Sequence, residues 1–246
     1  MENGSTHKDL ITDIHMHVIP GVDDGARTLE EACELLRLAS AEGIGRVFAT
    51  PHDPAFLYTD VRAVFRRLQE IVSARGIPVE LHLGCELRIS AQTAAQRLRG
   101  LDDGVYPTMG DSRCVLLEFV FDTPLEEYLY CIDLMRTAGY TPILAHLERY
   151  AQVDGRFAEA LRGAGALVQI NAYSIAEERD ERILRRANLF LSEGLVDLLG
   201  TDAHRTDHRP PRFRTGTDAF RRLYGEEYAA RAAVENPNKY LLQSVR

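Results

Sequence analysis

The sequence has few of the features that mark membrane, secreted or redox proteins. Its apolar runs are all much shorter than the roughly 20 residues needed to span a bilayer, and residues 1–8 are polar, unlike a signal peptide. The 4 cysteines stand far apart and form no Cys-x-x-Cys pair. We therefore expect a cytoplasmic protein without an integral membrane segment, whose cysteines are reduced and buried in the core.

Positive charge is also scarce. The 29 lysines and arginines are outnumbered by 37 acidic residues, so the formal net charge is −8. A general nucleic-acid binder needs clustered cations to neutralise phosphates, and nucleic acid is therefore excluded as a partner. Neither Gly-x-Gly-x-x-Gly nor a Walker pattern follows any predicted strand, which leaves the usual kinds of nucleotide binding unsupported.

What the sequence does contain is a regular alternation of apolar runs and helical patterns. With 246 residues and 45% hydrophobic composition, the chain can form one domain over residues 1–246. The alternation predicts a parallel sheet. Seven runs are predicted as strands: Leu10–His15, Arg46–Thr50, Val79–Gly84, Cys114–Phe119, Thr141–His146, Leu167–Asn171 and Val196–Thr201.

Three helices have clear start signals. Thr28 and Glu31 form a capping box before the first helix, and a second helix begins near Asp60. For the third, we expect Thr123 and Glu126 to form another capping box. Each of these helical patterns ends at a glycine.

Seven strand–helix units predict a barrel-like α/β fold with one unit fewer than the eight of a TIM barrel. An open doubly wound sheet is the alternative. In a parallel barrel the carboxyl ends of all the strands open onto one face, where active sites lie. Residues that follow different strands are then expected to converge.

Potential metal ligands occur at or just after these strand ends. They comprise five imidazoles and four carboxylates: His15, His17, Asp24, His52, Glu86, Glu118, His146, Asp202 and His204. Nine groups exceed what one ion can use, which implies two or three metals. Nitrogen and oxygen ligands without thiolate suit Mn, Fe or Zn better than Ca.

Two pairs with a spacing of two carry most of this argument. Side chains alternate along a strand, so His15 and His17 point to the same side, and Asp202 and His204 repeat the arrangement. The two pairs follow the first and last predicted strands, which a closed barrel makes neighbours. One such pair alone is weak evidence, and two neighbouring pairs are much stronger.

Other residues have competing interpretations. Glu118 lies in an apolar run, where a core salt bridge to an arginine competes with metal binding. Asp23 and Asp24 precede Gly25, and for Asp23 we favour a solvated turn residue. Three further histidines are assigned surface or packing roles: His7, His82 and His208.

Multinuclear sites of this composition hydrolyse phosphoesters. A water bridging two metals becomes hydroxide near neutral pH, and the metals stabilise the attacking and leaving oxygens. The phosphate also needs cationic donors, which Arg149 and Arg209 are placed to supply. For Arg209, a solvated side chain is an equal alternative.

With these residues in view, the chain resembles the PHP (polymerase and histidinol phosphatase) superfamily. The resemblance is to its bacterial manganese-dependent protein-tyrosine phosphatases, which are encoded with capsular or exopolysaccharide clusters. The segments that carry it are Asp13–His17, Pro20–Gly25, Ala49–His52, Gly84–Arg88, Leu117–Phe119, Ala145–Tyr150, Gln169–Asn171 and Gly200–His204. They span almost the whole chain in order.

The resemblance implies a distorted seven-stranded (β/α)7 TIM-like barrel, the PHP fold, that holds three Mn²⁺ ions, with Fe or Zn as alternatives. It implies that the nine candidates are the ligands and that Arg149 and Arg209 bind the phosphate. The implied substrate is the tyrosine-phosphorylated tail of a membrane-associated autokinase that controls polysaccharide export. Leu147 replaces a proline that is usual in the family, which changes the rigidity of that loop and leaves His146 and Arg149 in place.

Two other functions remain open from the sequence. A small-molecule phosphatase, such as histidinol-phosphate phosphatase, would use the same cluster. A non-catalytic barrel that binds a partner in a polysaccharide assembly complex would be expected to lack several ligands, and none is missing. A cysteine-dependent tyrosine phosphatase is disfavoured because no cysteine begins a Cys-x5-Arg loop. Assembly into a homo-oligomer is left open.

Overall fold

The computed structural model describes residues 10–242, in which strands and helices alternate and every strand pairing is parallel. The predicted α/β class with parallel sheets is confirmed. The strands are β1 (Thr12–Met16), β2 (Arg46–Ala49), β3 (Glu80–Leu83), β4 (Glu86–Ile89), β5 (Cys114–Phe119), β6 (Thr141–Leu144), β7 (Leu167–Asn171) and β8 (Leu198–Gly200).

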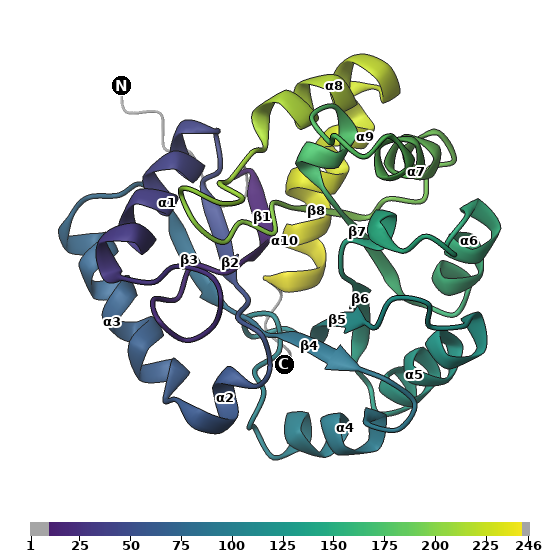
Figure 1. Cartoon of the computed structure of the whole chain (residues 1–246), viewed down its shortest axis with the longest axis horizontal. Helices are drawn as coiled ribbons and strands as arrows, with labels where there is room; N and C mark the ends of the chain where they lie inside the picture. Colours follow the sequence, from purple (N-terminus) through teal and green to yellow (C-terminus); the bar gives the residue numbers. More distant parts are fainter. Residues whose placement is uncertain (1–9, 243–246) are drawn as a thin grey trace.

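Helices surround these strands (Figure 1). They are α1 (Leu29–Ala41), α2 (Ala55–Tyr58), α3 (Val61–Ala74), α4 (Ala94–Asp102), α5 (Leu125–Thr137), α6 (Gly155–Gly163), α7 (Glu181–Ser192), α8 (Arg214–Tyr224), α9 (Glu226–Ala230) and α10 (Asn236–Leu241). Short helical turns are η2 (Leu147–Arg149), η3 (Ala172–Ile175) and η4 (Arg231–Glu235). None of the helices within residues 10–242 has the length and apolar character required to cross a membrane.

The strands divide into two sheets, so a closed seven-stranded barrel is not confirmed. One sheet has the order β1-β2-β3 and the other β4-β5-β6-β7-β8. The eighth strand is β4, which follows the third predicted run, Val79–Gly84, and was not predicted: β3 within that run pairs with β2, and β4 after it pairs with β5. Only isolated bridges join the two sheets, between Met16 and Ala203 and between His52 and Glu86.

Two of the three predicted helix starts are confirmed. Thr28 accepts a hydrogen bond from the backbone N–H of Glu31, and Asp60 caps α3 in the same way. The predicted capping box at Thr123 is wrong. Pro124, in extended conformation, takes the N-cap position of α5, and the Thr123 hydroxyl donates to the carbonyl of Val120.

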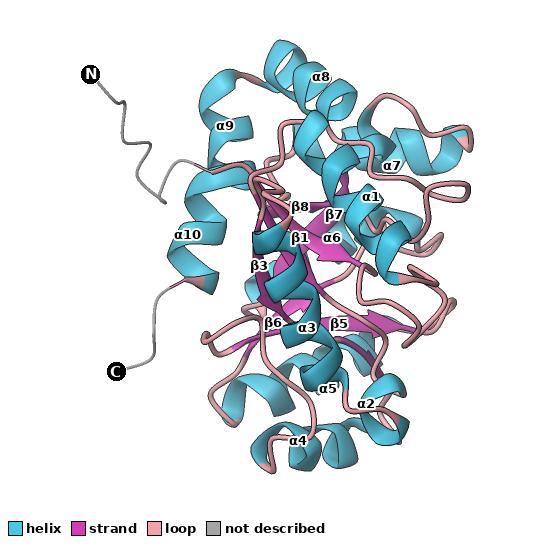
Figure 2. Ribbon diagram, turned by 90° about the vertical axis from the view of Figure 1, so that its left-hand side faces the viewer, coloured by secondary structure: helices cyan, strands magenta, loops and turns pink. Residues whose placement is uncertain are grey.

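The interior between the strands is apolar and is closed at one end by α10. Ile14, Phe48 and Leu116 pack there with Leu241 of α10. Cys114, the first residue of β5, donates from Sγ to a carbonyl of the same helix, which places α10 at the amino ends of the strands. Figure 2 shows α10 at this end. The opposite, carboxyl ends are therefore left for the polar residues.

A larger apolar layer fills the space between the strands and the surrounding helices. All four cysteines are buried and unpaired, as predicted: Cys33, Cys85, Cys114 and Cys131.

Candidate metal centre

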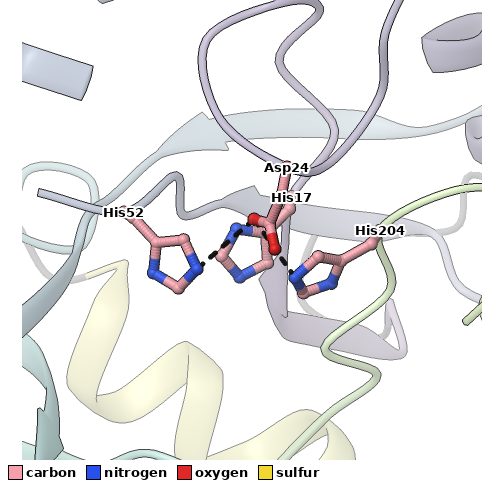
Figure 3. Close-up of side chains that lie close together, drawn as sticks. All are labelled: His17, Asp24, His52 and His204. Carbon is pink, nitrogen blue, oxygen red and sulfur yellow. Dashed lines mark ion pairs between the residues drawn. The ribbon is translucent and has the colours of Figure 1, made fainter. Parts of the chain in front are cut away.

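All nine predicted ligands converge at the carboxyl ends of the strands. They form four overlapping groups, and within each group one ligand atom from every residue lies within 4.8 Å of the others. The groups are His17, Asp24, His52 and His204; His15, His17 and Asp202; His15, Glu86 and His146; and His52, Glu86 and Glu118. Figure 3 shows the first of them.

Glu86 lies at the centre of the cluster. Its buried carboxylate is 3.4 Å from His15 Nε2, 3.3 Å from His17 Nε2, 3.0 Å from His52 Nδ1 and 3.0 Å from His146 Nε2. Burial opposes ionisation, but the surrounding imidazoles outweigh it and hold the pKa of Glu86 well below its usual value. One carboxylate can thus serve several cation positions at once.

Asp202 joins the histidines to two arginines. Its Oδ1 atom is 3.7 Å from His15 Nε2 and 3.6 Å from His17 Nε2, while Oδ2 accepts from Arg149 Nη1 at 3.0 Å and from Arg209 Nη1 at 2.9 Å. Asp202 lies beyond the end of β8 with a φ of +52°, a conformation rare outside glycine. The left-handed backbone at Asp202 therefore directs its side chain to the site, and strand alternation is not the cause.

Asp24 closes the rim of the site in Figure 3, between His52 and His204. Its side chain is 69% exposed, and Oδ1 lies 3.5 Å from His52 Nε2 and 3.6 Å from His204 Nε2. The next residue, Gly25, packs against the backbone of His17, where an added Cβ would stand 2.1 Å from the His17 carbonyl oxygen. Glycine at this position lets the loop that carries Asp24 approach so closely.

Asp23 is not the solvated turn residue that we predicted. Its side chain is only 5% exposed and accepts a hydrogen bond from His17 Nδ1 at 2.8 Å. The same carboxylate accepts from the backbone N–H groups of Gly25 and His52. With the ring proton assigned to Nδ1 by this acceptor, Nε2 of His17 presents its lone pair to the cluster, as metal-binding histidines commonly do.

Gln169 performs the same task for His15. Its Oε1 atom lies 3.3 Å from His15 Nδ1 and accepts from the backbone N–H of His146 at 2.8 Å. One amide oxygen therefore orients His15 and anchors the turn that carries His146. Gln169 lies in a segment that carries the family resemblance, but its side chain was not predicted to have a role in the site.

Asp13 is a second buried carboxylate that the sequence analysis did not single out. Its Oδ1 atom accepts from the backbone N–H groups of His15 and Thr201, which ties β1 to the end of β8. Burial raises its pKa to about 6, although these hydrogen bonds oppose the shift. A signal was available, because a carboxylate in an apolar strand needs compensating partners, as we argued for Glu118.

The donor set fits a cation. The Nε2 atoms of His15 and His17 face each other at 3.2 Å, with both Nδ1 atoms engaged elsewhere. Two atoms of the cluster, Glu86 Oε2 and His146 Nδ1, are among the buried side-chain atoms of the described residues that have no hydrogen-bond partner. Burial lowers the pKa of His15 and His17, but the nearby carboxylates outweigh it and raise both above the usual value. The cluster therefore attracts positive charge, and its nitrogen and oxygen donors suit a transition metal.

Glu118 has the arginine partner that the competing interpretation required. Arg88 Nη2 lies 2.8 Å from Glu118 Oε2, while the carboxylate also belongs to the group with His52 and Glu86. Arg88 was not among our candidates, although it stands two residues after Glu86 on β4, where alternation places both on one side. The ion pair and the metal role of Glu118 are compatible, since a carboxylate has two oxygens.

Seven of the nine predicted ligands, all except His15 and His17, line a small cavity of about 120 Å³. Arg88, Arg149 and Arg209 contribute guanidinium groups to its wall. The two other histidines among the described residues lie elsewhere. His82 of β3 stacks on Phe48 of β2, and His208 is exposed in the loop after β8. His7 lies outside the described residues. The cavity therefore combines imidazoles and carboxylates with three guanidinium groups, each of which pairs with one of the carboxylates.

The comparisons with known proteins agree with this geometry. A family model described as "Capsular polysaccharide synthesis, CpsB/CapC" matches residues 11–242. The tyrosine-protein phosphatase CpsB of Streptococcus pneumoniae is 27% identical over 244 residues, covering 95% of this chain and 99% of that protein. The putative tyrosine-protein phosphatase CapC of Staphylococcus aureus is 31% identical over 212 residues, covering 81% and 79%.

A solved structure extends the similarity to the fold. It comes from crystal structures of YwqE from Bacillus subtilis and CpsB from Streptococcus pneumoniae, described as metal-dependent tyrosine phosphatases. The TM-score is 0.84, the sequence identity is 24%, and 96% of each chain is covered. At this identity the likeness shows that the fold is shared.

Proposed function

The chain belongs to the CpsB/CapC family of capsular polysaccharide synthesis, and on this premise we propose that it is a metal-dependent protein-tyrosine phosphatase. The observation that carries the proposal is the convergence of nine nitrogen and oxygen ligands beside two arginines. Curated relatives matched over most of the chain are named tyrosine-protein phosphatases.

The proposed ligands are the nine converging residues, and the proposed cofactor is three Mn²⁺ ions, with Fe or Zn as alternatives. Four overlapping ligand groups that share Glu86, His15, His17 and His52 support more than one ion. When bound, the ions supply Lewis acidity that polarises the phosphoryl group and makes a nearby water more acidic.

Arg149 and Arg209 are proposed to bind the phosphoryl oxygens. Each guanidinium has five N–H donors, and each contacts Asp202 through Nη1 alone. The remaining donors can bind two oxygens of a phosphate in the fork geometry that guanidinium groups favour. Asp202 holds both arginine side chains at one wall of the cavity before the substrate arrives. The two side chains therefore lose little conformational entropy when the substrate binds.

The proposed substrate is the tyrosine-phosphorylated tail of a membrane-associated autokinase that controls capsular or exopolysaccharide export. The family description and the names of the relatives support this choice. We also propose a cytoplasmic location, which the four unpaired, buried cysteines favour. The homo-oligomeric state is left to measurement.

Metal removal tests the first part of the proposal. Dialysis against a chelator is expected to abolish hydrolysis of a phosphotyrosyl peptide, and added Mn²⁺ is expected to restore it. Metal analysis of the reconstituted protein should give about three equivalents per chain, the number implied by the family resemblance. Full activity in the metal-stripped protein would overturn the assignment of the cluster.

Substrate preference tests the second part. We expect kcat/KM at fixed Mn²⁺ to be higher for phosphotyrosyl peptides than for histidinol phosphate. A strong preference for histidinol phosphate would replace protein-tyrosine phosphatase by a small-molecule phosphatase. Loss of all hydrolysis with metal still bound would favour the non-catalytic binding barrel.

A further inference from the structure

A second pocket adjoins the metal cavity on the same face of the molecule. It has a volume of about 370 Å³ and lies between the loop after β7 and the loop after β8. Tyr173 and Arg179 contribute from the first loop, and His208 and Pro210 from the second. Arg209 lines both this outer pocket and the metal cavity, so the two spaces meet at its side chain.

The size of the metal cavity limits what it can hold. Its volume of about 120 Å³ is below the roughly 150 Å³ of a protein cavity that accommodates one benzene ring. Charged groups and histidines line it, and no phenyl or phenol side chain does. A phosphoryl group fits these walls, but the aromatic ring of a phosphotyrosine must lie elsewhere. The outer pocket has the volume of an ordinary small-molecule site.

Tyr173 gives the outer pocket an aromatic wall, and Arg209, one of the two proposed phosphate-binding arginines, lines the same pocket. Tyr173 belongs to η3, directly after β7, and is partly exposed. Its hydroxyl accepts from Asn171 Nδ2 at 3.4 Å, which fixes the ring beside the end of β7. Pro210 adds a second apolar ring surface to the same pocket. The pocket therefore offers the ring surfaces of Tyr173 and Pro210 among carboxylates and arginines, and it shares Arg209 with the metal cavity.

We propose that the outer pocket binds the phenyl ring of phosphotyrosine against Tyr173, while the metal cavity holds the phosphoryl group alone. Tyr173 is then a specificity-determining residue that favours aryl over alkyl phosphate monoesters. The inference rests on the proposed phosphatase function. It extends that function in two ways: the site selects phosphate monoesters with an aryl leaving group, and Tyr173 is the residue that makes this selection.

The test measures binding without turnover. Isothermal titration calorimetry of the Mn²⁺-loaded protein with phenylphosphonate, methylphosphonate and inorganic phosphate separates the ring from the anion. In the parent, phenylphosphonate should bind roughly tenfold more tightly than methylphosphonate, a ratio that corresponds to about 1.4 kcal/mol of aromatic and apolar contact. Tyr173→Ala should remove this difference and leave methylphosphonate and inorganic phosphate within about twofold of the parent.

Three further variants complete the test. Tyr173→Phe keeps the ring and should retain the preference, whereas Tyr173→Leu keeps an apolar side chain of similar reach and should lose most of it. Tyr173→Leu also replaces Tyr173→Ala if the latter does not fold. The matched control is Phe121→Ala: Phe121 is 57% exposed, packs on Tyr150 and lines neither cavity, so its removal should leave the preference unchanged.

Several outcomes would overturn the inference. One is that the parent binds phenyl- and methylphosphonate equally, and another is that Tyr173→Leu keeps the preference of the parent. The others are that Tyr173→Ala weakens the binding of all three anions equally, or that the preference is lost in Phe121→Ala instead of in the Tyr173 variants. Failure of the proposed function looks different: the parent would not hydrolyse phosphotyrosyl peptides, whatever phosphonate it prefers.

Discussion

Replacing Asp23 by asparagine tests whether this buried carboxylate prepares His17 for metal binding. In the structure, Asp23 Oδ2 accepts from His17 Nδ1 at 2.8 Å and from the backbone N–H of His52 at 3.2 Å, while Oδ1 accepts from Gly25 N–H at 3.0 Å. An asparagine has only one oxygen. Its NH2 group has two possible orientations. It faces either the N–H of Gly25, which is itself a donor, or the donors of His17 and His52.

Either orientation weakens the site. If the NH2 group faces His17, Nδ1 must become the acceptor and the ring proton moves to Nε2, the atom that faces Glu86. If it faces Gly25, two donors oppose each other in a half-buried loop. Loss of partners of this kind typically lowers metal affinity 10- to 100-fold, or about 1.4 to 2.7 kcal/mol, a range close to that of one hydrogen bond to a charged group.

In the assay, metal-stripped protein is titrated with Mn²⁺. Metal binding is measured by calorimetry, and the recovery of activity is measured as hydrolysis of a phosphotyrosyl peptide. We expect the Mn²⁺ midpoint of Asp23→Asn to rise 10- to 100-fold, with kcat near that of the parent at saturating Mn²⁺. Asp102→Asn is the matched control. It removes the same charge from a residue that bonds Tyr140 OH at the start of β6, at the end of the strands opposite the site. An unchanged midpoint in Asp23→Asn, or an equal shift in Asp102→Asn, would refute the reasoning.

Three other changes give distinct expectations. Arg149→Ala should lower kcat/KM for phosphotyrosyl peptides about 10²- to 10³-fold, because loss of one transition-state donor typically has an effect of this size. Metal analysis should find the same metal content as in the parent, and parent-like activity would remove Arg149 from the mechanism. Gly25→Ala should weaken Mn²⁺ binding, because the added Cβ would stand 2.1 Å from the His17 carbonyl oxygen. Gly163→Ala is the control and should leave Mn²⁺ binding unchanged, because no heavy atom lies within 4 Å of its added Cβ. Equal Mn²⁺ midpoints in the two variants would contradict this reasoning. Phe220→Ala should lower the free energy of unfolding by about 3 to 5 kcal/mol in urea denaturation, because the ring is fully buried in the main core, and a change below about 1 kcal/mol would contradict that packing.

The strand and ligand pattern was largely predictable because a parallel α/β fold repeats one geometric rule. Cys114–Phe119 and Leu167–Asn171 were predicted with the bounds that the structure has. Buried strands are continuous apolar runs, and their carboxyl ends share one face, so His52 and His146 could be placed together although 94 positions separate them.

Errors arose where a local pattern had two physical solutions. Thr123 has the sequence signature of a helix cap, but the extended Pro124 shifts the helix start by one residue, and the hydroxyl bonds Val120 instead. The predicted run Val79–Gly84 contains β3, but β4 directly after it was not predicted, because Glu86 and Arg88 interrupt its apolar character. β4 forms through its parallel pairing with β5, which local hydropathy does not reveal.

The sequence by itself determined which groups come together at the candidate site. Imidazoles and carboxylates at successive strand ends converge in a parallel α/β fold, because chain direction alone brings these ends together. Only the tertiary structure decided how each group is presented. Asp23 and Gln169 orient His17 and His15 through single hydrogen bonds, and Arg88 pairs with Glu118 across two strands. Such partners depend on side-chain directions and distances of a few ångströms, which no periodicity in the sequence encodes.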